Sequence, residues 1–269
     1  MRHLITIAAV GSIAAGTMIF SALPAEAVTF GTSFDGLGNS LQDKFNSLTV
    51  SGPNIDTINE QTNYQTFTNT ASSGSVATFM FEIAKYAPSN KFGIYNSKGD
   101  KALLFDGYND VSDGAKIDFL GNGDIAVTTK GYSPGNTNPT PPSYAEYKDF
   151  GNVFGFYLQR EDGTVFYTQN HRNQNKSQQA VIYQGKDRTT LKIPGRQPGL
   201  FTDNEIIVAF EDLLRVNGNS DSDFNDLVVL VESVRPVPEP STLGSLLAFS
   251  LCGIGLTRKH QRQKNSQLQ

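Results

Sequence analysis

Short runs of β-branched, aromatic and aliphatic residues recur along the middle of this chain, separated by clusters of Gly, Asn, Asp and Pro. Two of these runs flank Gly121-Asn122-Gly123, a trio that accepts positive φ and closes a hairpin. Runs this short are typical of strands rather than helices. The expected strands cover residues 76–83, 92–95, 102–105, 116–120, 124–128, 153–158, 164–167, 180–183, 206–210 and 227–231. The pattern predicts an all-β fold, a single jelly-roll-like β-sandwich.

The last two expected strands, 206–210 and 227–231, are apolar on both faces, so we expect them in the middle of a sheet. One segment departs from the β pattern. Leu37, Leu41, Phe45 and Leu48 recur at helical spacing after the possible caps Asn39 and Ser40. These residues predict one short amphipathic helix near the start of the domain.

The N-terminal residues 1–27 have the organisation of a secretory signal peptide. A short basic region precedes an apolar stretch at 4–23, and Ala25 and Ala27 form a small-x-small site for signal peptidase. Cleavage after Ala27 would leave a secreted domain that begins at Val28. The alternative is a retained membrane anchor.

The C-terminal residues 234–269 form a second signal. Pro238, Glu239 and Pro240 precede an apolar segment at 243–256, and a basic cluster follows at 258–262. The segment is short for a stable membrane span, and the basic cluster would hold its end on the cytoplasmic face. The alternative is a chance Pro-Glu-Pro before an ordinary anchor.

This order of features closely resembles the PEP-CTERM sorting signal of Gram-negative bacteria. The resemblance implies that an exosortase, a membrane protease-transpeptidase, recognises residues 238–240 and removes the tail. It further implies a transient stay in the inner membrane and delivery to the outer cell envelope or extracellular matrix. Such proteins often accompany exopolysaccharide production.

The body between the two signals, residues 28–233, is acidic. The whole chain has a formal net charge of −4, and its C-terminal tail is basic, so the body is more negative than the total. An acidic surface repels phosphate backbones, which argues against nucleic-acid binding and suits divalent cations. The one cysteine, Cys252, lies in the tail, so stability must come from the core or a bound metal.

Oxygen donors are densest between the last two expected strands. The candidate metal ligands are Glu211, Asp212, Asp221, Asp223, Asn225 and Asp226. Asp221, Asp223 and Asn225 alternate, so a looping backbone can aim them at one point, and hard oxygen donors suit Ca²⁺. An EF-hand is excluded, since position six is Asp226 rather than Gly and no helices flank the loop. The alternative is that these side chains make turns in a solvated loop.

The runs 209–213 and 221–226 resemble the signature of the domain-of-unknown-function family 4114. Residues 91–96 and 154–158 are similar to its earlier strands, so the resemblance extends over about 75–233. It implies a secreted bacterial protein and supports the Ca²⁺ hypothesis, since some members carry calcium-binding repeats. The segment 215–219 departs from the Gly-rich approach typical of the family.

The residues of the domain favour a protein that is not an enzyme. His171 is the domain's one histidine and lies in a polar loop; no nucleophile elbow, phosphate loop or dinucleotide motif occurs. We therefore expect a Ca²⁺-stabilised structural or adhesive protein. The alternatives are a polysaccharide-binding module, with a groove lined by Tyr132, Tyr144 and Tyr147, or a glycoside hydrolase with two carboxylates in one cleft.

Overall fold

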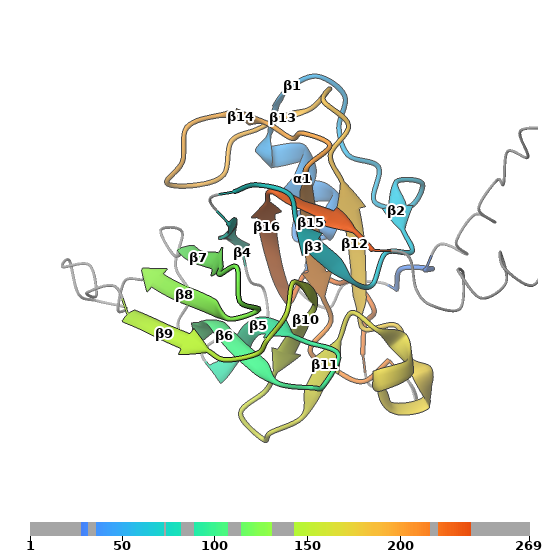
Figure 1. Cartoon of the computed structure of the whole chain (residues 1–269). Coiled ribbons are helices and arrows are strands. Elements are labelled where there is room, and N and C mark those ends of the chain that lie inside the picture. The colour runs from blue at the N-terminus through green and yellow to red at the C-terminus, as the bar shows by residue number, and fades with distance from the viewer. Residues whose placement is uncertain are drawn as a thin grey trace, which may run out of the picture.

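The computed structural model describes residues 28–31, 36–72, 74–81, 89–106, 114–130, 143–215 and 220–237, without side chains at 75–81, 106 and 130. Within them, strands form three antiparallel sheets and one short α-helix lies at one end (Figure 1). This confirms the predicted all-β sandwich with one helix. The expected signal peptide and sorting tail lie outside the described residues. In the described part, no helix is long and apolar enough to cross a membrane.

The largest sheet has eight strands and contains both central apolar strands. In spatial order it consists of β2 (Gln61–Thr62), β12 (Ala180–Gln184), β15 (Glu205–Phe210), β16 (Leu227–Glu232), β4 (Ser75–Phe81), β7 (Gly114–Phe119), β8 (Ile125–Lys130) and β9 (Ser143–Tyr147).

A six-stranded sheet packs against one face of the eight-stranded sheet. Its order is β17 (Val234–Pro236), β3 (Phe67–Asn69), β10 (Val153–Gln159), β5 (Lys91–Tyr95) and β6 (Lys101–Asp106), with β11 (Val165–Tyr167) also paired to β10. The 3-10 helices η2 (Asn170–Arg172) and η3 (Gln174–Lys176) follow β11. Phe92, Phe156 and Phe210 meet in the core between the sheets.

A smaller layer covers part of the other face of the eight-stranded sheet. It consists of helix α1 (Leu41–Leu48) and a three-stranded sheet of β1 (Thr49–Ser51), β13 (Thr190–Leu191) and β14 (Gly199–Leu200), grouped at the top of Figure 1. Ser40 caps α1 by accepting a hydrogen bond from the Asp43 amide at 3.2 Å. Leu37, which was expected on the apolar face of the helix, lies before it and is exposed.

The two central strands β15 and β16 are buried on both faces, as predicted. Ile206 and Val208 of β15 belong to the core between the two large sheets, whereas Ile207 and Ala209 belong to the core beneath α1. A strand buried on both sides keeps no polar position in its interior. Because both strands are packed on both faces, they fix the positions of the two ends of the loop that joins them.

Several short strands were not expected from the sequence: β1, β2, β3, β9, β13, β14 and β17. They have two to five residues and few consecutive apolar positions, so no period is visible in them. β17 pairs with β3 and lies beyond the domain boundary expected at residue 233. The folded part therefore extends to at least Val237, whose amide donates to the Thr66 carbonyl at 2.9 Å.

A repeated Phe-Gly-x-Tyr sequence in β5 and β10 has a packing role. The register places Gly93 opposite Tyr157, and Gly155 opposite Tyr95. Each tyrosine ring lies over the glycine of the other strand, where a Cβ atom would collide with it. The guanidinium of Arg172 stacks over the Tyr95 ring at 4.9 Å from its centroid. The repeat is therefore a structural device on the outer face of this sheet.

We predict that Gly155→Ala destabilises the fold, because its Cβ would lie 2.5 Å from Cζ of the buried Tyr95. Overpacking of this kind costs about 1–3 kcal/mol of unfolding free energy, which urea denaturation measures. Gly121→Ala is the matched control, since no atom lies within 4 Å of its added Cβ. Equal losses in the two variants would contradict this account of the repeat.

Candidate metal centre

The candidate site lies in the loop that connects β15 and β16. These strands pair in register from Glu205 opposite Glu232 to Phe210 opposite Leu227. Glu211 and Asp226 directly follow and precede the last pair, so their backbones lie side by side at the base of the loop. The two central strands thus fix one end of the acidic segment, as the sequence predicted.

The backbone of the loop takes an unusual alternating course. Ser222 and Phe224 have φ values of 57° and 56°, in the left-handed region that non-glycine residues rarely adopt. Strain in a bulky residue such as Phe224 persists only where the surroundings enforce it. The Phe224 ring is fully buried, and it packs edge-on against Phe30 with 5.3 Å between centroids. On another side lies the Arg215 guanidinium, 4.8 Å from the ring centroid.

This course of the chain brings three carboxylates together. Glu211, Asp221 and Asp223 each offer an oxygen atom, and these atoms lie within 4.8 Å of one another. Glu211 is fully buried, and the exposed fraction of Asp223 is 3%. Carboxylate oxygens converging on one point are the ligands that Ca²⁺ takes.

The buried carboxylate of Glu211 has few donors. Its Oε1 atom has no hydrogen-bond partner, and its Oε2 atom accepts a long hydrogen bond from the Phe224 amide at 3.5 Å. A hydrogen bond from the Ser220 side chain also acts on this carboxylate and lowers its pKa, but burial outweighs it. Among the described residues, no Lys or Arg forms an ion pair with Glu211 or Asp226. A buried anion without such compensation is strongly destabilising.

The other predicted ligands, Asp212, Asn225 and Asp226, form hydrogen bonds at and around this group. Asp226 Oδ2 accepts a hydrogen bond from the Asp212 amide at 2.7 Å, and Asp212 Oδ2 accepts one from Asn90 at 3.1 Å. The side-chain nitrogen of Asn225 donates to Asp223 Oδ2 at 2.7 Å and to the Asn39 carbonyl at 2.8 Å. These groups hold the loop in shape.

Burial and mutual repulsion disfavour the ionised forms of these acids. Burial raises the pKa of Glu211 to about 7, and the charges of Asp221 and Asp223 add to this effect. The pKa of Asp226 is raised well above its ordinary range, first by burial and then by the charge of Glu211. A bound cation would reverse both shifts by favouring the charged carboxylates.

Residues outside the predicted set also shape the site. Two of them, Phe30 and Asn39, come from the start of the domain and contact the loop across the fold. The third, Arg215, lies in the first part of the loop itself and stacks on Phe224. Arg215 belongs to the segment 215–219, which departs from the family pattern, and this departure was the one sequence feature that pointed to it. Nothing in the sequence marked Phe30 or Asn39 as neighbours of the loop.

Acidic residues elsewhere in the described part of the chain form no group of this kind. Asp124 accepts from the Asp149 amide at 2.8 Å and pairs with Lys148 at 3.0 Å, so it stabilises a turn. Asp110 and Asp113 lie outside the described residues, as does the Asp106 side chain. His171 is exposed in η2.

Of the tyrosines expected to line a glycan groove, the two that the structure describes differ in exposure. Tyr144 is exposed on β9, but Tyr147 packs against the core and receives a hydrogen bond from the Leu103 amide at 3.3 Å. Tyr132 lies outside the described residues. The expectation that Tyr147 is exposed was wrong, because the side chain alternates to the inner face of the sheet.

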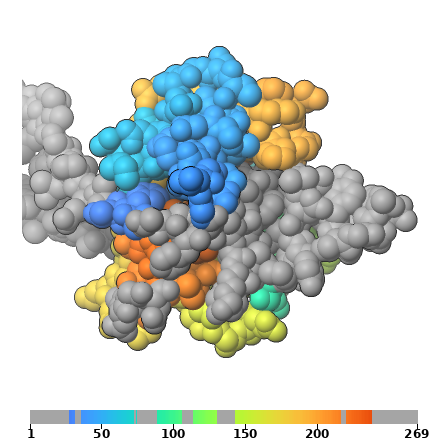
Figure 2. Space-filling view, turned by 180° about the vertical axis from the view of Figure 1, so that it is seen from behind, coloured from blue at the N-terminus to red at the C-terminus, as the bar shows by residue number. Residues whose placement is uncertain are grey.

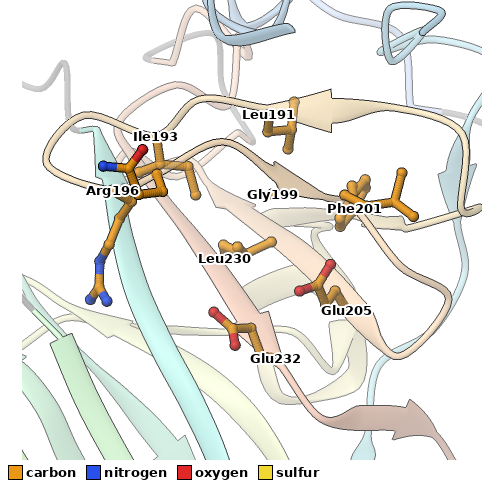
Figure 3. A pocket seen from close by; sticks show the side chains of 10 residues that line it. Leu191, Ile193, Arg196, Gly199, Phe201, Glu205, Leu230 and Glu232 are labelled. Carbon is orange, nitrogen blue, oxygen red and sulfur yellow. The ribbon is translucent and has the colours of Figure 1, made fainter. Parts of the chain in front are cut away.

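A separate pocket of about 210 Å³ lies between the β13–β14 sheet and strands β15 and β16 (Figure 3). Glu205 and Glu232, directly opposite each other in the two strands, border it together with Leu191, Ile193 and Leu230. Burial raises the pKa of Glu205, and the charge of Glu232 adds to the shift. Two carboxylates against an apolar wall are too few oxygens for Ca²⁺, but a glycosidase would need such a pair.

Residues 129–234 match the family described as "Domain of unknown function (DUF4114)". The match includes the complete acidic loop and both central strands, but it covers less than half of the chain. Residues 75–128, which the sequence resemblance had included, lie outside it. No curated protein and no solved structure matches the chain.

We predict that the metal-free protein loses stability as the pH rises from about 5 to 8. The folded pKa of Glu211 is about 7, raised from an ordinary value of 4.5, so in this range the folded state binds more protons than the unfolded state. Stability contributed by the protonated form is complete below the ordinary pKa and is lost through pH 7. Thermal melting in a chelator at several pH values measures this.

The control for this prediction is Glu211→Gln, which removes one titrating group and should weaken the pH dependence, with the remainder due to Asp226. Asp124 and Asp162 have lowered pKa values, so their titration affects stability only at more acidic pH. A wild-type protein that gains stability from pH 5 to 8 without metal would contradict the proposed electrostatics.

Proposed function

We propose that this protein is an exported, non-catalytic structural or adhesive protein of the outer cell envelope or extracellular matrix, stabilised by Ca²⁺ in the β15–β16 loop. The observation that carries the proposal is the fully buried Glu211 carboxylate, which has one oxygen without a hydrogen-bond partner and converges with the carboxylates of Asp221 and Asp223. A cation at this point would supply the missing partner.

The donor set favours Ca²⁺ over other common metals. The group consists of carboxylates, without the thiolate or imidazole ligands that Zn²⁺ prefers. Ca²⁺ takes six to eight oxygen ligands in irregular geometry, which backbone carbonyls and water can complete around a loop. Mg²⁺ requires near-ideal octahedral geometry and dehydrates reluctantly, so an irregular loop site suits it less.

The site's position explains what the ion would contribute. The loop joins two strands buried on both faces, and the domain has no cysteine to form a disulfide. An ion bound only to the folded state stabilises it by mass action. In an environment rich in Ca²⁺, this linkage would take the place of a covalent staple.

Export is the second part of the proposal and rests on the two terminal signals. Signal peptidase would cleave after Ala27, and an exosortase-type enzyme would act at residues 238–240. The acidic body argues against nucleic acid as a partner.

We predict that Ca²⁺ raises the melting temperature and that Glu211→Gln abolishes this response. At a Ca²⁺ concentration one hundred times Kd, the gain is about 2.7 kcal/mol, which corresponds to about 5–10 °C for a domain of this size. The neutral amide also removes repulsion, so metal-free Glu211→Gln should melt above metal-free wild type. Differential scanning calorimetry with Ca²⁺ or EDTA measures both effects.

Glu161→Gln is the matched control, because it removes the same charge from an exposed turn between β10 and β11. It should respond to Ca²⁺ as the wild type does. An unchanged wild-type melting temperature at millimolar Ca²⁺ would remove the metal proposal.

We predict that the exported protein begins at Val28 and lacks the residues that follow the sorting motif. Glu239→Ala should keep the tail attached, because it alters the central residue of the motif. Intact-mass spectrometry of protein collected from the producing bacterium and its medium measures both ends. A wild-type product with the mass of the whole chain would refute both processing steps.

A further inference from the structure

The segment 28–31 lies directly against the acidic loop, although almost two hundred residues separate them in the sequence. In Figure 2 its dark blue atoms lie beside orange atoms from the C-terminal part of the domain. The Gly31 amide donates to the Ser222 carbonyl at 3.0 Å, and the Phe30 ring meets Phe224 edge-on with 5.3 Å between centroids. Both partners are the loop residues with positive φ.

Gly31 is required by the closeness of this contact. A Cβ atom at this position would collide with the carbonyl oxygen of Asp221, one of the three converging acids. The segment and the loop backbone therefore approach as closely as only glycine permits. Any side chain at Gly31 would displace either the segment or Asp221.

The other end of the segment is anchored in the domain. The Val28 nitrogen donates to Gln61 Oε1 at 2.8 Å, and Gln61 Nε2 returns a hydrogen bond to the Val28 carbonyl at 3.2 Å. The Val28 side chain belongs to the core beneath α1, together with Phe224. The segment is thus held at both ends and presses on the strained residues of the loop.

We propose that residues 28–31, the first residues left by cleavage after Ala27, form a structural part of the calcium site. Docking of this segment and Ca²⁺ binding stabilise each other. This inference rests on the proposed function of the loop. The segment contributes no carboxylate; it holds Ser222 and Phe224 in the backbone conformation that directs Asp221 and Asp223 toward Glu211. Coupling of this kind is reciprocal, so Ca²⁺ must also hold the segment in place.

The first test measures Ca²⁺ affinity by isothermal titration calorimetry on the full chain and its variants. Phe30→Ala and Gly31→Ala should each weaken Ca²⁺ binding about tenfold or more, within the usual range of coupling between sites. Phe30→Leu keeps an apolar contact and should recover most of the affinity. Leu37→Ala, an exposed position in the next described segment, is the control and should bind as the wild type does.

The second test uses the unaltered protein and so does not depend on any variant folding. Hydrogen exchange at the Gly31 amide reports docking, because this amide donates to the Ser222 carbonyl. Ca²⁺ should slow its exchange about tenfold or more in the wild type, by the same coupling. In Glu211→Gln, Ca²⁺ should leave the exchange rate unchanged.

The outcomes separate the two proposals. If the wild type takes up no Ca²⁺, the proposed metal function fails and this inference fails with it. If the wild type binds Ca²⁺ but Phe30→Ala and Gly31→Ala bind equally well, or if Gly31 exchange ignores Ca²⁺, the segment is not part of the site. In that case the calcium proposal stands alone.

Discussion

Repulsion between carboxylates buried at the end of two central strands is the constraint on which the rest of this structure depends. Glu211 and Asp226 adjoin the last pair of β15 and β16, where cores on both faces of the sheet exclude water. Low polarity makes an unpaired charge costly and a paired one strong. The fold therefore creates a place where a cation has much to stabilise.

The surroundings of the loop are arranged to keep its shape rather than to neutralise its charge. Phe224 is held at positive φ between Phe30 and Arg215, and Asn225 ties Asp223 to the chain near α1. Arg215 interacts electrostatically with Glu211, but its guanidinium forms hydrogen bonds with Ser222 Oγ and the Gln178 carbonyl and no ion pair among the described residues.

The outer faces of the two large sheets are covered in different ways. In the six-stranded sheet, tyrosines lie over glycines and cations lie over the tyrosines, so that the outer face is closed by aromatic packing. In the eight-stranded sheet, a helix and a small sheet cover part of the second face, and Phe224 of the acidic loop belongs to the same core. The start of the domain lies on this side of the eight-stranded sheet, where Phe30 and Gly31 contact Phe224 and Ser222 of the acidic loop.

Local patterns were sufficient for much of this architecture. Alternating and continuous apolar runs predicted the long strands and the central position of β15 and β16, because side-chain period and burial are linked directly. Short strands such as β3 and β17 were missed, since two or three residues show no period and pair only through distant partners. The density of acids between residues 211 and 226 was visible in the sequence, and the predicted site lies there.

Which of those acids converge was decided by tertiary structure alone. Alternation of Asp221, Asp223 and Asn225 predicted a common centre; in the structure Glu211, from the base of the loop, converges with Asp221 and Asp223, and the side-chain nitrogen of Asn225 donates to Asp223 and Asn39. That choice depends on positive φ at Ser222 and Phe224, and so on contacts with Phe30 and Gly31. Residue types thus determined the chemistry of the site, whereas contacts between distant segments determined its geometry, because backbone strain is held only by the packed surroundings.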